Sequence, residues 1–254
     1  MTLKDVQSPT RMLGSLGDRL RRAVGHRDYT RFIVLSRSRT GSNMLISFLN
    51  SHPDILVEGE VLAKLNGRDH RDILARVYGK QPHHVKAKGF KVFYYHPQDG
   101  DPDSLLADLI GQRDLRVIHL KRRNILRTLI SRKIAAAQDV WAVTTSTPTE
   151  IARRKAVRLS VEELEDGFRQ TRAWEERGDA AFSGHRTVSI YYEDLVASPE
   201  ASFETILGFL DLPYRPLETN HRRQNPEHLE DLVTNYGELK AAFAGTPWQD
   251  FFED

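Results

Sequence analysis

Hydrophobic and polar positions along this chain follow two alternating patterns. Short, nearly continuous apolar runs predict buried strands, and each is followed by a stretch with apolar residues every third or fourth position, which predicts a helix. In the first such pair, Phe32 and Val34 lie in the strand, and Leu45 and Phe48 lie on one side of the helix. The predicted strand and helix pairs are 31–36 with 43–50, 88–96 with 104–111, and 115–121 with 124–137.

The second half of the chain continues the pattern. A fourth strand is predicted over 185–195, and Ser198 and Pro199 mark the start of another helix as N-cap and first-turn residue. A long charged helix precedes this strand, from 149 or 160 to 177, after a polar loop at 143–149. Strands that alternate with helices predict an α/β fold with a mostly parallel central sheet and helices on both faces.

Length and spacing favour one large domain over residues 31–254, preceded by a basic amphipathic segment over 1–30. In that segment Leu13, Leu16 and Leu20 recur at helical spacing between arginines. Such a helix packs on its own domain, on a second subunit or on a membrane surface. A homodimer through this segment or through the long helix is therefore a possible arrangement.

The amino-acid composition excludes several kinds of functional site. The chain has no cysteine, which excludes disulfides, thiolate metal sites and cysteine nucleophiles, and a cytoplasmic location is the default expectation. No apolar stretch is long enough to span a bilayer, and the first thirty residues lack the apolar segment of a secretion signal. The ten histidines form no ligand pattern, so no metal is expected. The formal charge is only +2, although eight basic residues cluster between Arg113 and Lys133.

The stretch "SRSRTGSNML" lies between the first strand and its helix and is typical of an anion-binding turn. Free N–H groups and the helix dipole favour an anion at such a helix start, and Gly41 allows close backbone approach. The triphosphate-binding loop reads G-x-x-x-x-G-K-[ST], and both its first glycine and its lysine are missing here. The candidate anion ligands are Arg37, Arg39, Thr40, Gly41, Ser42 and Asn43.

A second motif, "VIHLKRRNILRTLIS", repeats this arrangement at the end of another strand. Arg123, Arg127 and Ser131 fall at steps of four, so we expect them to share one face of the following helix. Two strand-to-helix anion sites in one chain suit a ligand that carries phosphates at two ends.

These motifs resemble those of sulfotransferases that use 3′-phosphoadenosine-5′-phosphosulfate (PAPS). "RSRTGSN" is similar to their 5′-phosphosulfate loop, and the arginine and serine eight apart in "RRNILRTLIS" resemble their 3′-phosphate motif. "YYEDLVASPEASFETILGFLDLP" and "HRRQNPEHLEDLVTNYGELKAAF" also resemble the superfamily, above all the bacterial carbohydrate sulfotransferases that include the nodulation-factor and trehalose enzymes. The resemblance spans about residues 30 to 245 and implies a P-loop-like parallel sheet.

The resemblance also implies residue roles. The loop cation falls on Arg39, and the loop donors fall on Thr40 to Asn43. The 3′-phosphate pair falls on Arg123 and Ser131, with Arg222 and Arg223 as further contacts. Ser38 departs from the pattern, because many members have proline before the loop cation.

The implied reaction transfers a sulfuryl group to an acceptor hydroxyl, with carbohydrate or glycolipid as acceptor, and releases 3′,5′-bisphosphoadenosine (PAP) without a metal. Arg39 would neutralise charge on the departing phosphate. The segment "SHPDILVEGEVL" supplies candidates for the base. Glu60 is the first choice by resemblance, with Glu58 and His52 as alternatives.

Two other functions compete with this one. A nucleotide-dependent kinase or phosphotransferase with a degenerate phosphate loop is disfavoured, because the loop lysine and a metal-binding acid after a strand are missing. A nucleic-acid-binding module would use the basic cluster at 113–133, but apolar positions recur periodically within it and the total charge is near zero. Nucleic acid is therefore not an expected partner.

Overall fold

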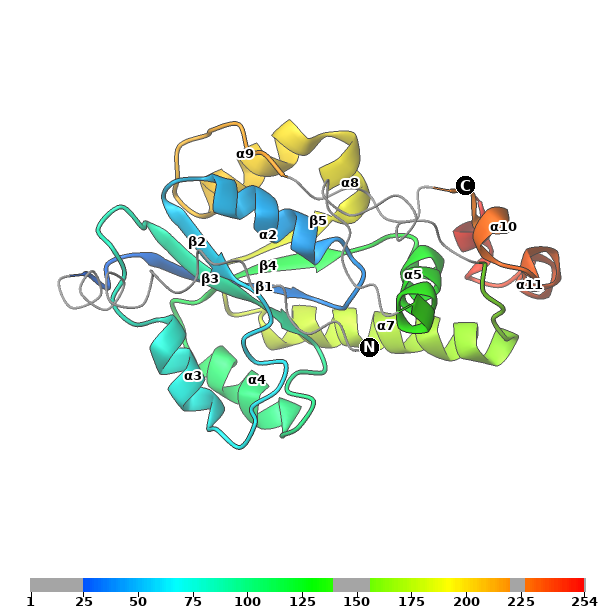
Figure 1. Ribbon diagram of the computed structural model, residues 1–254, viewed down its shortest axis with the longest axis horizontal. Coiled ribbons are helices and arrows are strands. Elements are labelled where there is room, and N and C mark those ends of the chain that lie inside the picture. Colours follow the sequence, from blue (N-terminus) through cyan, green and yellow to red (C-terminus); the bar gives the residue numbers. More distant parts are fainter. Residues whose placement is uncertain (1–24, 139–155, 220–226, 254) are drawn as a thin grey trace, which may run out of the picture.

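The computed structural model describes residues 25–138, 156–219 and 227–253, and strands and helices alternate through them (Figure 1). The predicted loop at 143–149 and most of the segment at 1–30 lie outside these ranges. The strands are β1 (Thr30–Ser36), β2 (Ile55–Glu58), β3 (Ala87–Phe93), β4 (Arg116–Lys121) and β5 (Thr187–Tyr191). The helices are α2 (Ser42–Ser51), α3 (His70–Val77), α4 (Pro102–Gly111), α5 (Ile125–Gln138), α7 (Val161–Ala181), α8 (Tyr192–Ala197), α9 (Pro199–Phe209), α10 (Leu229–Leu232), α11 (Tyr236–Ala242) and the 3-10 helix η2 (Gln249–Phe252).

The strands of the described ranges form one parallel sheet in the order β2-β3-β1-β4-β5. The predicted α/β fold with a parallel sheet is therefore confirmed. The chain leaves β1 toward β2 and β3 on one side, then crosses to β4 and β5 on the other. The C-terminal ends of β1 and β4 are thus adjacent at the point where the strand order reverses, which is where ligands bind in open α/β sheets.

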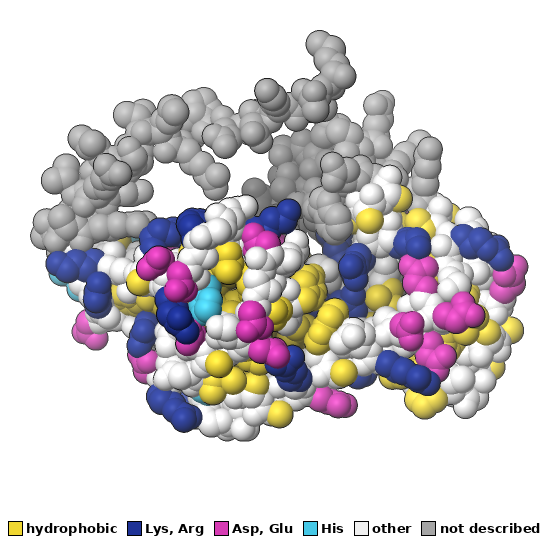
Figure 2. Space-filling view, turned by 90° about the horizontal axis from the view of Figure 1, so that it is seen from below, with side chains coloured by type: hydrophobic (Ala, Val, Ile, Leu, Met, Phe, Trp, Pro, Cys, Tyr) yellow, Lys and Arg dark blue, Asp and Glu magenta, His cyan; other side chains and the backbone are white. Residues whose placement is uncertain are grey.

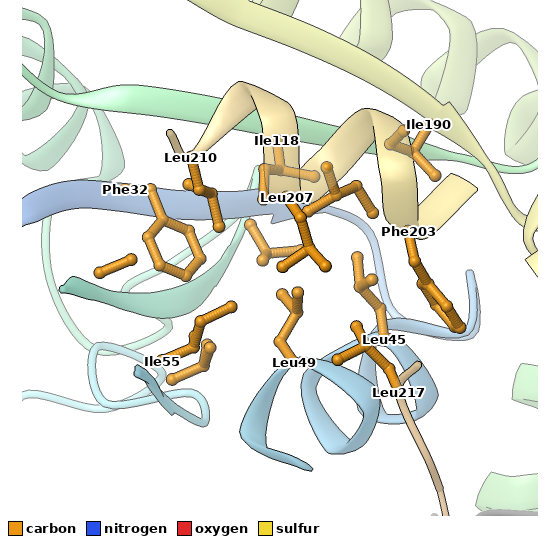
Figure 3. Packing of buried hydrophobic residues seen from close by; sticks show 14 of the residues in the cluster. Phe32, Leu45, Leu49, Ile55, Ile118, Ile190, Phe203, Leu207, Leu210 and Leu217 are labelled. Carbon is orange, nitrogen blue, oxygen red and sulfur yellow. The ribbon is translucent and has the colours of Figure 1, made fainter. Parts of the chain in front are cut away.

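The continuous apolar sequence of β1 reflects burial on both faces of the sheet. Phe32 and Val34 belong to a cluster with side chains of α2 and α9, among them Leu45 and Phe203. Figure 3 shows Phe32 beside Leu210 in this cluster. Ile33 belongs to a second cluster on the opposite face of the sheet. Helices α3 and α4 cover this face (Figure 1). Helices thus cover both faces and leave the strand ends to form the site.

A third hydrophobic cluster holds α5 and α7 together at the C-terminal end of the sheet. Phe168 of α7 packs with Phe243 and Phe252, which come from the last helices of the chain. This cluster also contains Leu126 and Ile130 of α5. The C-terminal segment therefore fixes the helix that carries Ser131.

The structure corrects several predicted boundaries. The fourth strand ends at Tyr191 instead of continuing to 195, because Tyr192 begins α8 and its ring packs against Gly41 and Arg122. Tyrosine favours strands, but tertiary packing overrides this preference here. β3 ends at Phe93, so residues 94–96 lie beyond the strand, α7 extends to Ala181, and α3 was not predicted.

The outer edge of β2 is closed by side-chain and backbone groups from the end of α2. The side-chain amide of Asn50 donates to the Val57 carbonyl oxygen at 2.9 Å and accepts from the Val57 N–H at 2.8 Å. The N–H of Ile55 donates to the carbonyl oxygen of His52 at 3.2 Å. These bonds satisfy backbone groups that an edge strand would otherwise expose.

We predict that Gly89→Ala destabilises the protein by about 1–3 kcal/mol, because the added methyl group overpacks the contact between β1 and β3. A Cβ at this position would lie 2.7 Å from the Phe32 carbonyl oxygen and 2.7 Å from its ring. Urea unfolding measures the difference. Gly208→Ala in α9 is the control, because no described atom lies within 4 Å of its Cβ position and alanine favours helix. Equal stability of the two variants would contradict this packing.

Candidate active site

Residues 37–41 connect β1 to α2 through a tight turn. Arg39 and Gly41 both have left-handed backbone, with φ of 72° and 85°. The carbonyl oxygen of Gly41 accepts from the N–H of Leu45 at 3.0 Å and so starts α2. A Cβ on Gly41 would overlap the ring of Tyr192. Glycine is therefore required here by backbone conformation and by the close approach of Tyr192.

The two arginines of this loop point in different directions. Arg37 is buried and donates to the hydroxyl of Thr171 on α7, and burial lowers its pKa to about 10. Arg39 instead crosses to α5, where its Nε donates to the Oγ of Ser131 at 3.0 Å. The hydroxyl of Thr40 donates to the Arg37 carbonyl oxygen at 2.9 Å, which tightens the turn. The loop and α5 are therefore within the reach of one side chain.

The first turn of α2 lies beside a buried lysine. Ser42 is buried, and the Oδ1 of Asn43 accepts from the Nζ of Lys91 at 2.5 Å. The first turn of α2 contains no acidic residue. The partial positive charge of the helix start and the ammonium of Lys91 therefore add at one place, which favours an anion there.

The start of α5 differs from the expected second anion site. Its helix begins at Ile125, so Arg123 precedes the helix and does not share a helical face with Ser131. The carboxylate of Glu193 accepts from the N–H groups of Arg123 at 3.0 Å and Asn124 at 3.3 Å. The protein's own carboxylate thus occupies two backbone donors just before this helix.

Two consecutive arginines pair with two consecutive tyrosines. Arg123 forms a two-point ion pair with Asp194 at 2.7 Å, and its guanidinium lies 4.2 Å from the centre of the Tyr191 ring. Arg122 lies 4.4 Å from the centre of the Tyr192 ring and donates to the Arg39 carbonyl oxygen at 3.2 Å. Arg122 therefore ties the loop after β4 to the loop after β1, a role that the sequence analysis did not assign.

The three candidate bases lie in different surroundings. One carboxylate oxygen of Glu60 is 2.8 Å from the Nζ of Lys91, which also bonds Asn43 at the start of α2. Glu58 instead accepts from Lys88 at 2.7 Å. His52 is the C-cap of α2, at the opposite end of that helix from the loop. Of the three, Glu60 is the one connected to the anion-binding loop.

His96 lies on the other side of Glu60. Its Nδ1 accepts from the N–H of Phe93 at 3.2 Å, so the neutral ring carries its proton on Nε2. That Nε2 is 3.6 Å from the second carboxylate oxygen of Glu60. Burial lowers the pKa of His96 to about 4, and it also lowers the pKa of Lys91, although Glu60 opposes both shifts.

Comparison with known proteins assigns the chain to a family. A model of the sulfotransferase family matches residues 112–216. Nodulation protein H of Rhizobium meliloti strain 1021 is 30% identical over 237 residues, which cover 87% of this chain and 94% of that protein. Nodulation protein H of Rhizobium tropici is also 30% identical and covers 87% of this chain. The chain belongs to the sulfotransferase family.

The chain is also similar to a solved structure. The sulfotransferase from Alicyclobacillus acidocaldarius is 15% identical and aligns over 88% of this chain and 94% of its own, with a TM-score of 0.49. Because the chain belongs to the sulfotransferase family, it is an enzyme, and sulfuryl transfer is its reaction in place of the phosphotransferase alternative.

The described residues also bear on a membrane span, a metal site and a nucleic-acid-binding surface. No described helix has the length and apolar character needed to cross a bilayer. Among the described residues no group of three or more potential ligands could hold a metal ion. On the face in Figure 2 basic and acidic side chains are interspersed over the described surface, unlike a nucleic-acid-binding face. Arg222 and Arg223 lie outside the described residues.

Lys91, His96 and Arg122 belong to the site but were not predicted from the sequence. Lys91 and His96 were included in or next to an apolar strand that was interpreted as core, and both are indeed buried. A lysine within such a strand is itself a signal, since a buried charge requires a partner. Arg122 was adjacent to Arg123 and could have been found from the matching doublets "RR" and "YYED".

We predict that the sulfotransferase loses stability as the pH falls from 6.5 toward 4. Burial lowers the pKa of both His96 and His119 from 6.5 to about 4, so the unfolded chain binds more protons within this window. The stabilisation is complete above pH 6.5 and decreases by roughly 1 kcal/mol per pH unit for each histidine. Chemical denaturation at a series of pH values measures it.

The matched variant for this measurement is His96→Gln. It should show a shallower decrease between pH 6.5 and 4 than the wild type. Aspartates with lowered pKa values, such as Asp108 and Asp179, are present in both proteins, so their contribution cancels in the comparison of the two slopes. An unchanged slope in the variant would refute the assignment of a neutral, buried His96.

Proposed function

We propose that this sulfotransferase moves a sulfuryl group from PAPS to a hydroxyl of a carbohydrate or glycolipid acceptor. The observation that carries the proposal is the 3.0 Å hydrogen bond between Arg39 and Ser131. These residues match the two separate donor motifs, and their contact lies where the sheet order reverses. A single adenosine-based molecule can therefore contact both motifs.

The side chains around this contact suit sulfate and phosphate oxygens. Arg39 and Lys91 supply positive charge, and Ser131 and Ser42 supply hydroxyl donors. The turn at Gly41 presents backbone N–H groups at the start of α2. Arg123 is held end-on by Asp194, and the Nε edge of its guanidinium offers two further donors to an oxyanion.

Arg39 and Lys91 take complementary electrostatic roles in this proposal. When bound, PAPS supplies the sulfuryl group, and negative charge grows on the phosphate that departs. Arg39 stays protonated and stabilises this charge without donating its proton. Lys91 replaces the missing loop lysine from the neighbouring strand β3, because its ammonium lies at the first turn of α2.

Glu60 is proposed as the general base. As the acceptor oxygen bonds to sulfur and the bond from sulfur to the phosphate oxygen breaks, the acceptor proton passes to the Glu60 carboxylate. Lys91 holds one oxygen of this carboxylate at 2.8 Å and so fixes its position. The acceptor class follows from the resemblance to bacterial carbohydrate sulfotransferases, and the similarity to Nodulation protein H supports it.

PAP should raise the melting temperature of the protein markedly more than adenosine diphosphate does, because only PAP carries the 3′-phosphate that Arg123 and Ser131 would bind. At a hundredfold excess over its Kd, PAP should stabilise the fold by about 2.7 kcal/mol. Differential scanning fluorimetry compares the two nucleotides. Ser131→Ala should reduce the difference between the thermal shifts caused by PAP and by adenosine diphosphate. Equal shifts in the wild type would exclude the assignment of the 3′-phosphate to Arg123 and Ser131.

Glu60→Gln should reduce kcat by about 100-fold or more while leaving PAP affinity unchanged, because it removes the base and retains the shape. Glu58→Gln is the matched control, since its carboxylate pairs with Lys88 instead of Lys91. Turnover is followed by release of PAP. Full activity of Glu60→Gln with loss in Glu58→Gln would transfer the role to Glu58, and His52→Gln tests the third candidate.

A further inference from the structure

Three partly exposed aromatic side chains gather beside the site. Tyr94 and Tyr95 follow the C-terminal end of β3, and Trp174 comes from the middle of α7. The ring centres of Tyr95 and Trp174 are 5.3 Å apart, and those of Tyr94 and Trp174 are 6.1 Å apart with nearly parallel planes. We name these three residues the aromatic platform.

The platform contacts both Arg37 of the donor loop and His96, the neighbour of the candidate base. On one side the guanidinium of Arg37 is 5.8 Å from the centre of the Trp174 ring. On the other side the Tyr95 ring is 5.5 Å from the ring of His96, whose Nε2 faces Glu60 at 3.6 Å. An acceptor must reach both the sulfuryl donor and its base, so the platform occupies a place where the acceptor can be held.

Hydrogen bonds to β4 and α7 hold the platform in place. The hydroxyl of Tyr94 bonds the Nε2 of His119 at 2.6 Å, and the Nδ1 of that histidine bonds Asp179 on α7 at 2.8 Å. This chain links the end of β3 through β4 to the helix that carries Trp174. Tyr94 and Trp174 also line one apolar hollow, whose other walls include Leu105 of α4. Tyr94 and Trp174 are therefore held in fixed positions at the wall of this hollow, with Tyr95 outside it.

We propose that Trp174 and Tyr95 bind one sugar ring of the acceptor by stacking. The C–H groups on one face of a pyranose carry partial positive charge and pack against the negative face of an aromatic ring. The hydroxyls at the edge of the sugar then remain available to Glu60. A phosphate or another small anion would gain little from such rings. This inference rests on the proposed function and specifies how its acceptor is recognised.

Binding of neutral sugars to the PAP complex tests the proposal. The probes are mono- to tetrasaccharides of glucose and of N-acetylglucosamine, and saturation-transfer NMR detects their contact with the protein. In the wild type, saturation should concentrate on the axial C–H protons of one ring face. Trp174→Ala should raise the sugar Kd about tenfold, which corresponds to about 1.4 kcal/mol.

Two variants separate stacking from a general loss of structure. Trp174→Phe should retain most of the sugar affinity, because it keeps an aromatic face. Trp248→Phe, in the third hydrophobic cluster, is the matched control and should bind sugars like the wild type. In Trp174→Ala the thermal shift caused by PAP should be unchanged, which verifies that the donor site is intact.

The outcomes distinguish the two proposals. If PAP stabilises the protein but Trp174→Ala binds sugars as tightly as the wild type, or if no sugar in the set binds the wild type, the platform proposal is overturned. If PAP fails to stabilise the wild type, the donor assignment fails instead, and the same sugar measurements on the free wild type and the free variants still decide the role of Trp174.

Discussion

The site depends on the parallel pairing of β1 with β4. The two strands run side by side in the same direction, with Val34 opposite Ile118. Both strands therefore end at the same edge of the sheet. The loop after β1 and the residues before α5 therefore meet there, and Arg39 reaches Ser131. Any change that separated these strands would also separate the two halves of the proposed donor site, however intact each motif remained.

Buried charge is the second constraint on this edge of the sheet. Lys88 and Lys91 both lie in β3 with almost no exposure, and each has its own carboxylate partner, Glu58 or Glu60. An unpaired ammonium in such surroundings would be strongly destabilising, so the segment after α2 is needed for folding as well as for chemistry. Because Glu58 pairs with Lys88 and Glu60 pairs with Lys91, these two glutamates have different roles although they are only two residues apart. Glu58 has a structural role, and Glu60 is proposed as the base.

The sequence predicted much of the fold because its strongest signals are local. The runs around Phe32 and Val117 indicate strands buried on both faces, and the turn at Gly41 follows from residue types alone. The errors concern contacts between distant segments. The carboxylate of Glu193 caps α5 across 70 residues of sequence, and Tyr192 forms a helix because it packs on the loop at Gly41. Lys91 and His96 were missed for the same reason, since their partner Glu60 comes from another segment.

The closed edge of β2 limits how copies of this chain can assemble. With Asn50 holding both backbone groups of Val57, a strand from another molecule finds no open ladder on that side. A symmetric pair of subunits therefore cannot arise by extending the sheet through β2, which is one of its two edge strands. The same capped margin blocks strand-to-strand polymerisation through β2.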